Sequence, residues 1–238
     1  MATMAPEQRT IAFVLYPGLT PLDLVGPLQV FASLAKLRPE FRPVVVAERI
    51  APMATDIELD MMAEATFADL PEPEIIVVPG GIAGTLRALS NDPVRQYVRS
   101  AGQTADTVVS VCTGSLILAS VGLLEGRPAT THWGARGVLE NLGSPYQRER
   151  WVRAGNVVTT AGVSAGIDMA LWLVAELTDE ETARRVQLDI EYDPQPPFGG
   201  LDLAAIGRVP RAVRSVVTLV APLMTRRPKR MSRQAGWA

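Results

Sequence analysis

The chain has 238 residues, of which 47% are hydrophobic and 20% charged, and its formal net charge is −2. These values are typical of a globular protein. One cysteine cannot form an intramolecular disulfide, and one cysteine with one histidine cannot build the usual structural zinc sites, so a disulfide-stapled mini-protein is excluded. No apolar run approaches the ~20 residues of a membrane span and the first ten residues are polar, so we expect a cytoplasmic protein without a signal peptide.

The charge is unevenly distributed along the chain. Residues 1–200 contain 15 basic and 24 acidic side chains, whereas residues 201–238 contain 8 basic and 1 acidic. A basic end raises the question of a nucleic-acid or anionic-membrane partner. Because no aromatic side chains alternate with the basic ones, we predict neither partner. The segment is instead predicted to form a helix over residues 208–227 that lies on the acidic body or on a partner subunit.

Short apolar runs alternate with longer helical stretches, which is the pattern of an α/β domain. Residues 11–16 are almost continuously apolar and end at Pro17-Gly18, as in a central parallel strand. A helix is predicted next, beginning within residues 22–27 and ending before Pro39. The remaining predicted elements, in chain order, are strands at 41–47, 74–78 and 106–111, a strand or hairpin at 152–160 broken at Gly155-Asn156, and a helix at 162–177.

These elements predict one doubly wound, mostly parallel sheet with crossover helices. We assign it to residues 10–200, after a frayed N-terminus at residues 1–9 and before a basic helical tail at residues 201–238. Ligands bind such sheets outside the carboxyl ends of the strands. Three segments place polar or reactive groups there, namely residues 20–27, 79–81 and 112–115.

The strongest candidate group is Cys112, which stands where residues 108–111 turn directly into a helix. Such a bend is typical of a nucleophile elbow, which holds the side chain at the corner out of the sheet. Gly114 allows the turn to tighten, and Thr113 adds a hydroxyl donor beside the sulfur. Because helix N-termini lower thiol pKa values, we expect Cys112 to be a reactive thiolate. The alternative is a small buried hydrophobic side chain.

Two further groups follow neighbouring strands. The turn Pro79-Gly80-Gly81 offers backbone N–H groups that can hold developing negative charge, although such a turn can also simply end a strand. Asp23 has apolar neighbours, and burial of this kind raises a carboxyl pKa and favours proton donation near neutral pH. Its alternative role is to cap the helix that follows.

His132 is the only histidine, and therefore the only imidazole base available to the thiol. Spacing alone does not decide whether it lines the site or has a structural role. The neighbouring Trp133 is predicted either to form an aromatic wall for an apolar ligand or to belong to the core.

Together these motifs resemble the ThiJ/PfpI superfamily, whose members share the flavodoxin-like fold of class I glutamine amidotransferases. The resemblance is carried by Cys112 in its elbow and by residues 22–27, 79–81 and 130–133, and it extends through residues 161–168 and 185–198. Many superfamily members have a glutamate after the first strand and a histidine directly after the cysteine. The aspartate and the Cys-Thr pair of this chain resemble the isonitrile hydratase branch, and they argue against a protease or amidase of the Cys-His type.

The resemblance implies a carbon–oxygen lyase that adds water to an organic isonitrile and releases an N-substituted formamide, with no metal or organic cofactor. Cys112 is then expected to attack the isonitrile carbon and form a thioimidate, while Asp23 or Thr113 relays the proton. The expected substrate-binding and oxyanion residues are Gly80, Gly81, His132 and Trp133. The resemblance also implies a homodimer.

A second class of protein shares these motifs, since similar domains form the ligand-sensing half of AraC-type transcription regulators. Such regulators carry a DNA-binding module of roughly a hundred residues after the domain. About forty residues follow the predicted domain here. That difference and the presence of Cys112 favour an enzyme, while a ligand sensor, a redox-protective protein or another cysteine hydrolase of the superfamily stays the alternative.

Overall fold

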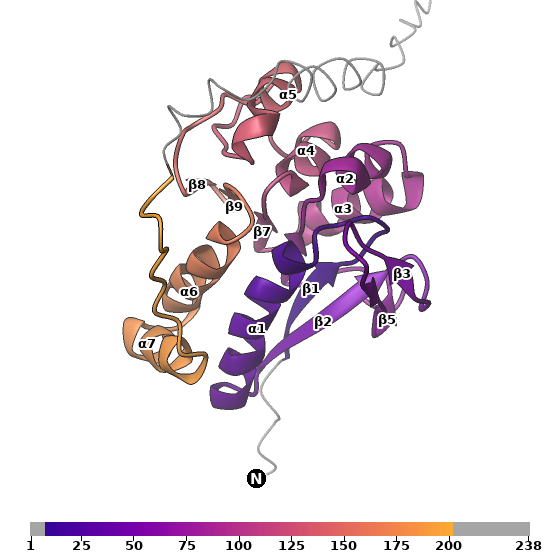
Figure 1. Ribbon diagram of the computed structural model, residues 1–238. Coiled ribbons are helices and arrows are strands. Elements are labelled where there is room, and N and C mark those ends of the chain that lie inside the picture. Colours follow the sequence, from indigo (N-terminus) through magenta and orange to yellow (C-terminus); the bar gives the residue numbers. More distant parts are fainter. Residues whose placement is uncertain (1–7, 202–238) are drawn as a thin grey trace, which may run out of the picture.

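A computed structural model describes residues 8–201. The predicted helix at 208–227 and nearly all of the predicted frayed N-terminus lie outside these residues. Within the described part, seven strands form one sheet in the order β5-β2-β1-β6-β7-β9-β8 (Figure 1). Their bounds are β1 Arg9–Val14, β2 Phe41–Ala47, β5 Ala65–Thr66, β6 Ile75–Val78, β7 Thr107–Ser110, β8 Trp151–Ala154 and β9 Val157–Thr160. Two more strands, β3 Met53–Ala54 and β4 Asp60–Met61, form a separate antiparallel pair.

All neighbouring strands of the large sheet are parallel except β8 and β9, which pair antiparallel. The predicted doubly wound, mostly parallel sheet is therefore confirmed. The break at Gly155-Asn156 turns residues 152–160 into a hairpin, because Gly155 takes the positive φ of 69° that the tight connection requires. The hairpin places β8 at one edge of the sheet.

Helices cover both faces of the sheet. Their bounds are α1 Pro21–Leu37, α2 Ile82–Ala88, α3 Asp92–Thr104, α4 Gly114–Ser120, α5 Arg136–Asn141, α6 Ala165–Leu177 and α7 Glu180–Asp189. The chain moves from β1 to β2 in one direction and from β6 through β7 to β9 in the other. Right-handed crossovers therefore put α1 on one face and α3 on the opposite face. The helices α6 and α7 pack with α1, while α2, α3 and α4 pack together (Figure 1).

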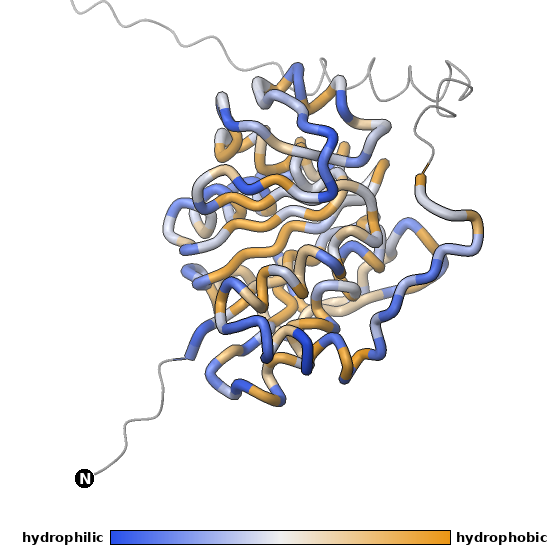
Figure 2. Tube along the Cα trace, turned by 90° about the vertical axis from the view of Figure 1, so that its left-hand side faces the viewer, coloured by the Kyte–Doolittle hydropathy of each residue, from blue (hydrophilic) through white to orange (hydrophobic). Residues whose placement is uncertain are grey.

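The apolar runs of the sequence form the core. Side chains at positions 11–14 of β1 and throughout β6 are completely buried, as expected for central strands covered by helices on both faces. Figure 2 shows these central strands as predominantly hydrophobic, with hydrophilic residues toward the outside. No helix within residues 8–201 is both long and apolar enough to cross a membrane.

The structure adds details that the sequence pattern missed. Strand β1 begins at Arg9, because its ladder with β2 starts there and the Arg9 guanidinium pairs with Glu74 at 2.5 Å. The connection between β6 and β7 contains two helices, α2 and α3. Asn91 accepts a hydrogen bond from the backbone N–H of Val94 at 3.3 Å and caps α3 as a new helix. Helix α7 was not predicted.

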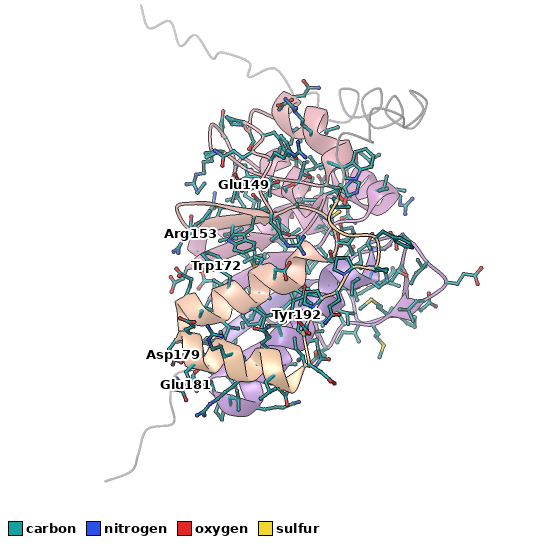
Figure 3. The ribbon with its side chains drawn as sticks, turned by 60° about the vertical axis from the view of Figure 1, so that its left-hand side comes forward. Glu149, Arg153, Trp172, Asp179, Glu181 and Tyr192 are labelled. Carbon is teal, nitrogen blue, oxygen red and sulfur yellow. The ribbon has the colours of Figure 1, made fainter. Side chains whose placement is uncertain are left out.

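The edge strand β8 is attached to α6 by aromatic and charged side chains. The rings of Trp151 and Trp172 are 5.8 Å apart, and the Arg153 guanidinium lies 5.9 Å from the centre of the Trp172 ring. Arg153 also pairs with Glu176 at 2.8 Å. Figure 3 shows Arg153 reaching from the strand toward Trp172 on the helix. These contacts hold β8 against α6.

Candidate functional site

Cys112 occupies the bend between β7 and α4. Its φ of 57° lies in the left-handed region, which is uncommon for a residue other than glycine. The carbonyl oxygen of Cys112 accepts hydrogen bonds from the hydroxyls of Thr131 at 3.1 Å and Ser115 at 3.2 Å. A strained corner held in this way is the geometry of the predicted nucleophile elbow.

Asp23 lies beside the elbow, in the first turn of α1. The N-cap of this helix is Thr20, so the alternative capping role of Asp23 is wrong. The Asp23 carboxylate instead accepts a hydrogen bond from the backbone N–H of Gly80 at 3.0 Å and interacts with the Cys112 thiol. The acid that sequence reasoning selected therefore lies next to the sulfur, brought there from 89 positions away along the chain.

Glycine is required where the turn after β6 meets these groups. A Cβ atom added to Gly80 would lie 2.5 Å from the backbone nitrogen of Thr113 and 2.9 Å from Asp23 Oδ2. Any larger residue would separate the acid from the elbow.

Thr113 connects the elbow to the same turn. Its hydroxyl oxygen accepts a hydrogen bond from the backbone N–H of Gly81 at 2.9 Å and lies 2.9 Å from the hydroxyl of Thr85 on α2. Both the backbone N–H and the hydroxyl of Thr113 are within hydrogen-bonding reach of the sulfur. Thr113 therefore contacts the thiol, as expected, but its hydroxyl has other partners as well.

The two N–H groups of the glycine turn have a different role from the one we expected. Gly80 donates to Asp23 and Gly81 donates to Thr113, so both groups are already hydrogen-bonded to side chains. The prediction that they form an oxyanion site is corrected accordingly. These N–H groups hold the acid and the hydroxyl in place.

Burial changes the acidity of the Asp23 carboxyl. Asp23 is completely inaccessible to solvent, and loss of hydration raises its pKa to about 7, against the smaller lowering effect of the Gly80 hydrogen bond. Its Oδ1 atom is buried without a nitrogen or oxygen partner within residues 8–201. A carboxyl with this pKa is suited to proton transfer near neutral pH.

Burial also affects the ionisation of the thiol. Cys112 is 4% exposed, and desolvation followed by the negative charge of Asp23 raises its pKa, with Thr113 opposing the shift only partly. Burial therefore opposes the thiolate that the elbow predicts, and the reactive state of Cys112 stays a prediction.

His132 and Trp133 lie on a turn next to the elbow. His132 precedes the short 3₁₀ helix η1, Trp133–Ala135, and its Nδ1 accepts a hydrogen bond from the backbone N–H of Gly134 at 3.3 Å. The two rings are 5.1 Å apart and both side chains are half-buried. No hydrogen bond within the described residues joins His132 to Cys112 or Asp23. Burial lowers the pKa of His132, which favours the neutral ring.

Sequence reasoning missed two groups of this region, Tyr16 and Thr85. Tyr16 Oη donates a hydrogen bond to the carbonyl oxygen of Pro79 at 2.8 Å and lies 3.2 Å from Thr85 Oγ1. A polar ring at the end of the first apolar strand was a usable signal for Tyr16. Nothing in the local sequence marks Thr85, which reaches the site only because α2 packs against α4.

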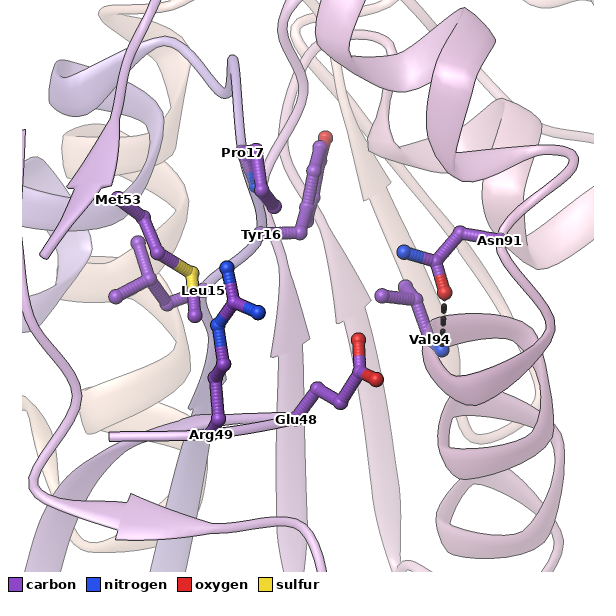
Figure 4. Close-up of a pocket in the computed structure, with 8 residues that line it drawn as sticks. All are labelled: Leu15, Tyr16, Pro17, Glu48, Arg49, Met53, Asn91 and Val94. Atoms are coloured by element: carbon purple, nitrogen blue, oxygen red, sulfur yellow. Dashed lines mark hydrogen bonds between the residues drawn. The ribbon is translucent and has the colours of Figure 1, made fainter. Parts of the chain in front are cut away.

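A separate cavity of about 240 Å³ lies beside the ends of β1 and β2. Figure 4 shows Glu48 and Arg49 pointing into it, with the Tyr16 ring and Asn91 on its walls. Neither Cys112 nor Asp23 lines this cavity, so it is distinct from the cysteine site. Within residues 8–201, no group of three His, Cys, Asp or Glu side chains is placed to hold a metal ion.

Comparisons with known proteins show the family of the chain. A family model described as the DJ-1/PfpI family matches residues 9–176. An isonitrile hydratase of Pseudomonas putida is 42% identical over 188 residues, which is 79% of this chain and 80% of the relative. A crystal structure of a ThiJ/PfpI family protein from Pseudomonas syringae has a TM-score of 0.81 and 35% identity, and the alignment covers 95% of this chain and 98% of that one.

A relative of another functional class is also similar. A helix-turn-helix-type transcriptional regulator of Pseudomonas aeruginosa is 26% identical over 177 residues, which is 73% of this chain and 52% of the regulator. The similarity thus spans about half of that protein.

Proposed function

The chain belongs to the DJ-1/PfpI family, and from this premise we propose that it is an isonitrile hydratase, a lyase that adds water to an organic isonitrile. The observation that carries the proposal is the buried Asp23 carboxyl, which accepts a hydrogen bond from the Gly80 N–H at 3.0 Å and interacts with Cys112 at the nucleophile elbow. The 42% identity to the Pseudomonas putida isonitrile hydratase supports the choice of substrate class.

The reaction begins with addition of the thiol to the isonitrile carbon. Asp23, as the carboxylate, accepts the thiol proton while the sulfur forms a bond to the terminal carbon of R–N≡C. Asp23 then donates this proton to the electron pair on that carbon. The product is the thioimidate R–N=CH–S–Cys112, and Asp23 is a carboxylate again.

Water completes the reaction. Asp23 accepts a proton from the attacking water, whose oxygen binds the thioimidate carbon, and then donates that proton to the substrate nitrogen to give R–NH–CH(OH)–S–Cys112. The carbonyl forms as the C–S bond breaks, the hydroxyl proton passes to the sulfur, and R–NH–CHO leaves. The sum is one isonitrile and one water converted into one formamide, with thiol and carboxylate restored.

Exposed apolar side chains near the acid and the glycine turn suit an apolar R group. Leu22, beside Asp23, is 46% exposed, and Ile82, after Gly81, is 60% exposed.

These exposed apolar side chains also suit contact with a second copy of the chain, and a homodimer stays part of the proposal. Light scattering after size-exclusion chromatography tests it, and a single species with the mass of one chain would contradict it.

The experiment that tests the function is incubation of the purified protein with an alkyl isonitrile and detection of the N-formyl amine by mass spectrometry. We expect formamide to accumulate with many turnovers per protein molecule. Water labelled with ¹⁸O should place the label in the formyl oxygen. Equal rates with the wild-type protein and with Cys112→Ala would reject the hydratase in favour of the ligand-sensing class represented by the regulator.

A further inference from the structure

The cavity of about 240 Å³ beside β1 and β2 lies where a parallel sheet usually binds ligands. Its lining includes residues 15–17, which directly follow β1, residues 48–49, which directly follow β2, and Asn91 at the start of α3. The carboxyl ends of two neighbouring strands therefore open onto it. Its volume is below the roughly 300–1,000 Å³ of pockets for drug-sized molecules, so it suits a small ligand.

Two side chains of opposite charge point into this cavity without pairing. Figure 4 shows the Glu48 carboxylate and the Arg49 guanidinium directed into the same space. Neither group forms an ion pair or a hydrogen bond within residues 8–201. Both side chains are exposed, so a molecule from solution can reach them. A ligand that carries one charge of each sign can engage both groups at once.

The neutral polar groups of the cavity add one hydrogen-bond donor. Asn91 Oδ1 accepts a hydrogen bond from the backbone N–H of Val94 at 3.3 Å, whereas Asn91 Nδ2 has no partner within the described part of the chain. Figure 4 shows Nδ2 on the side that faces the two charged groups. The Tyr16 hydroxyl points away from them and donates to the Pro79 carbonyl oxygen, so Tyr16 presents its ring to the cavity.

The rest of the lining is apolar. It consists of the side chains of Leu15, Pro17, Met53 and Val94, together with the ring of Tyr16. An apolar group of the ligand can pack against these side chains. A bound ligand also displaces water from both charged groups, so a ligand with a single charge would leave the other group desolvated and unpaired, which is unfavourable.

We propose that this cavity is a second binding site, for a small zwitterion of the α-amino-acid type with an apolar side chain. The carboxylate of the ligand binds the Arg49 guanidinium and accepts a hydrogen bond from Asn91 Nδ2. Its ammonium group binds the Glu48 carboxylate, and its side chain packs against the apolar lining. The site goes beyond the proposed hydratase function, because neither Cys112 nor Asp23 lines the cavity.

The test is isothermal titration calorimetry of the full-length chain at pH 7 with L-leucine and two analogues. Leucinamide lacks the carboxylate, and 4-methylpentanoate lacks the ammonium group. We expect saturable binding of leucine and about tenfold weaker binding of each analogue, the effect of losing one charged hydrogen-bonded contact. A 4-methylpentanoate that binds as tightly as leucine would overturn the assignment of a zwitterion.

Variants of the two charged residues identify the groups that bind the ligand. Arg49→Gln should weaken leucine binding about tenfold and abolish the preference for leucine over leucinamide. Glu48→Gln should abolish the preference for leucine over 4-methylpentanoate. Arg42→Gln and Glu72→Gln are matched controls, because both replace exposed residues that do not line the cavity, and they should bind leucine as the wild type does.

The proposal is overturned if the wild-type protein shows no saturable binding of leucine. It is also overturned if both cavity variants bind leucine as the wild type does, or if the matched controls weaken binding as much as the cavity variants. Cys112→Ala separates the two sites. It should bind leucine normally whether or not the wild-type protein forms formamide, and loss of leucine binding in this variant would place the ligand at the cysteine site instead.

Discussion

The two sides of the site differ in how their polar groups are held. On the elbow side, Asp23 and Thr113 are buried and hydrogen-bond to Gly80 and Gly81, which are 57 and 32 positions away in the chain. On the turn side, His132 is half-buried and its Nδ1 atom bonds to Gly134, two positions away. Tertiary packing positions the first set of groups, and local chain geometry positions the second.

This difference indicates where chemistry is concentrated. A group that is desolvated and tied to distant elements has its pKa shifted and its geometry fixed, and both favour catalysis. A group that hydrogen-bonds only within its own turn keeps more conformational freedom. It contributes chiefly to the shape of the surface next to the site. We therefore expect substitutions on the elbow side to have the larger effects on turnover.

The largest expected effect is that of Cys112→Ala. Without the sulfur no thioimidate forms, so formamide production should fall to the rate of the buffer control. The thioimidate adduct at residue 112, seen by intact-protein mass spectrometry during wild-type turnover, should be missing from the variant. Residual catalysis above the buffer control would show that another residue is the nucleophile.

Asp23→Asn should reduce kcat/KM by ~10²-fold or more, the usual effect of losing a positioned proton-transfer group. The amide keeps the size of the side chain and can still accept the Gly80 hydrogen bond. Because burial disfavours the carboxylate, the free energy of unfolding at pH 8 should not be lower for the variant than for wild type. Near-full activity of Asp23→Asn would assign the carboxyl a structural role.

The pH dependence should show the acidity of Asp23. The active form has Asp23 as carboxylate, and its pKa is raised to about 7, so kcat/KM should decrease as the pH falls below about 7, approaching tenfold per pH unit. Stopped assays between pH 5 and 9 measure this profile. In Asp23→Asn the decrease of kcat/KM below about pH 7 should disappear from the residual activity. A decrease that persists in this variant would show that another group titrates.

His132→Ala should have the smallest effect, a decrease of kcat/KM of less than about tenfold, because the ring has no hydrogen bond to the acid or the thiol within residues 8–201. Side-by-side steady-state kinetics with Asp23→Asn measure the contrast directly. A loss as complete as that of Cys112→Ala would remove the distinction between the two sides.

Several features were predictable because they depend on short-range patterns. The bend at Cys112 follows from an apolar strand meeting a helix, and the neighbourhood of Asp23 is apolar in the sequence itself. The family could likewise be identified from short segments of the sequence. The oxyanion role of Gly80 and Gly81 could not be judged in this way, since it depends on which side chains already occupy their N–H groups.

The sequence by itself therefore determined the parallel sheet, the nucleophile elbow and the family, because periodicity and turn residues act over a few neighbouring positions. Only the tertiary structure decided that burial raises the pKa values of Cys112 and Asp23, and that Thr85 and Tyr16 lie beside the site. Proton affinity and hydrogen-bond direction depend on burial and on partners brought together from distant segments, and no local pattern encodes them.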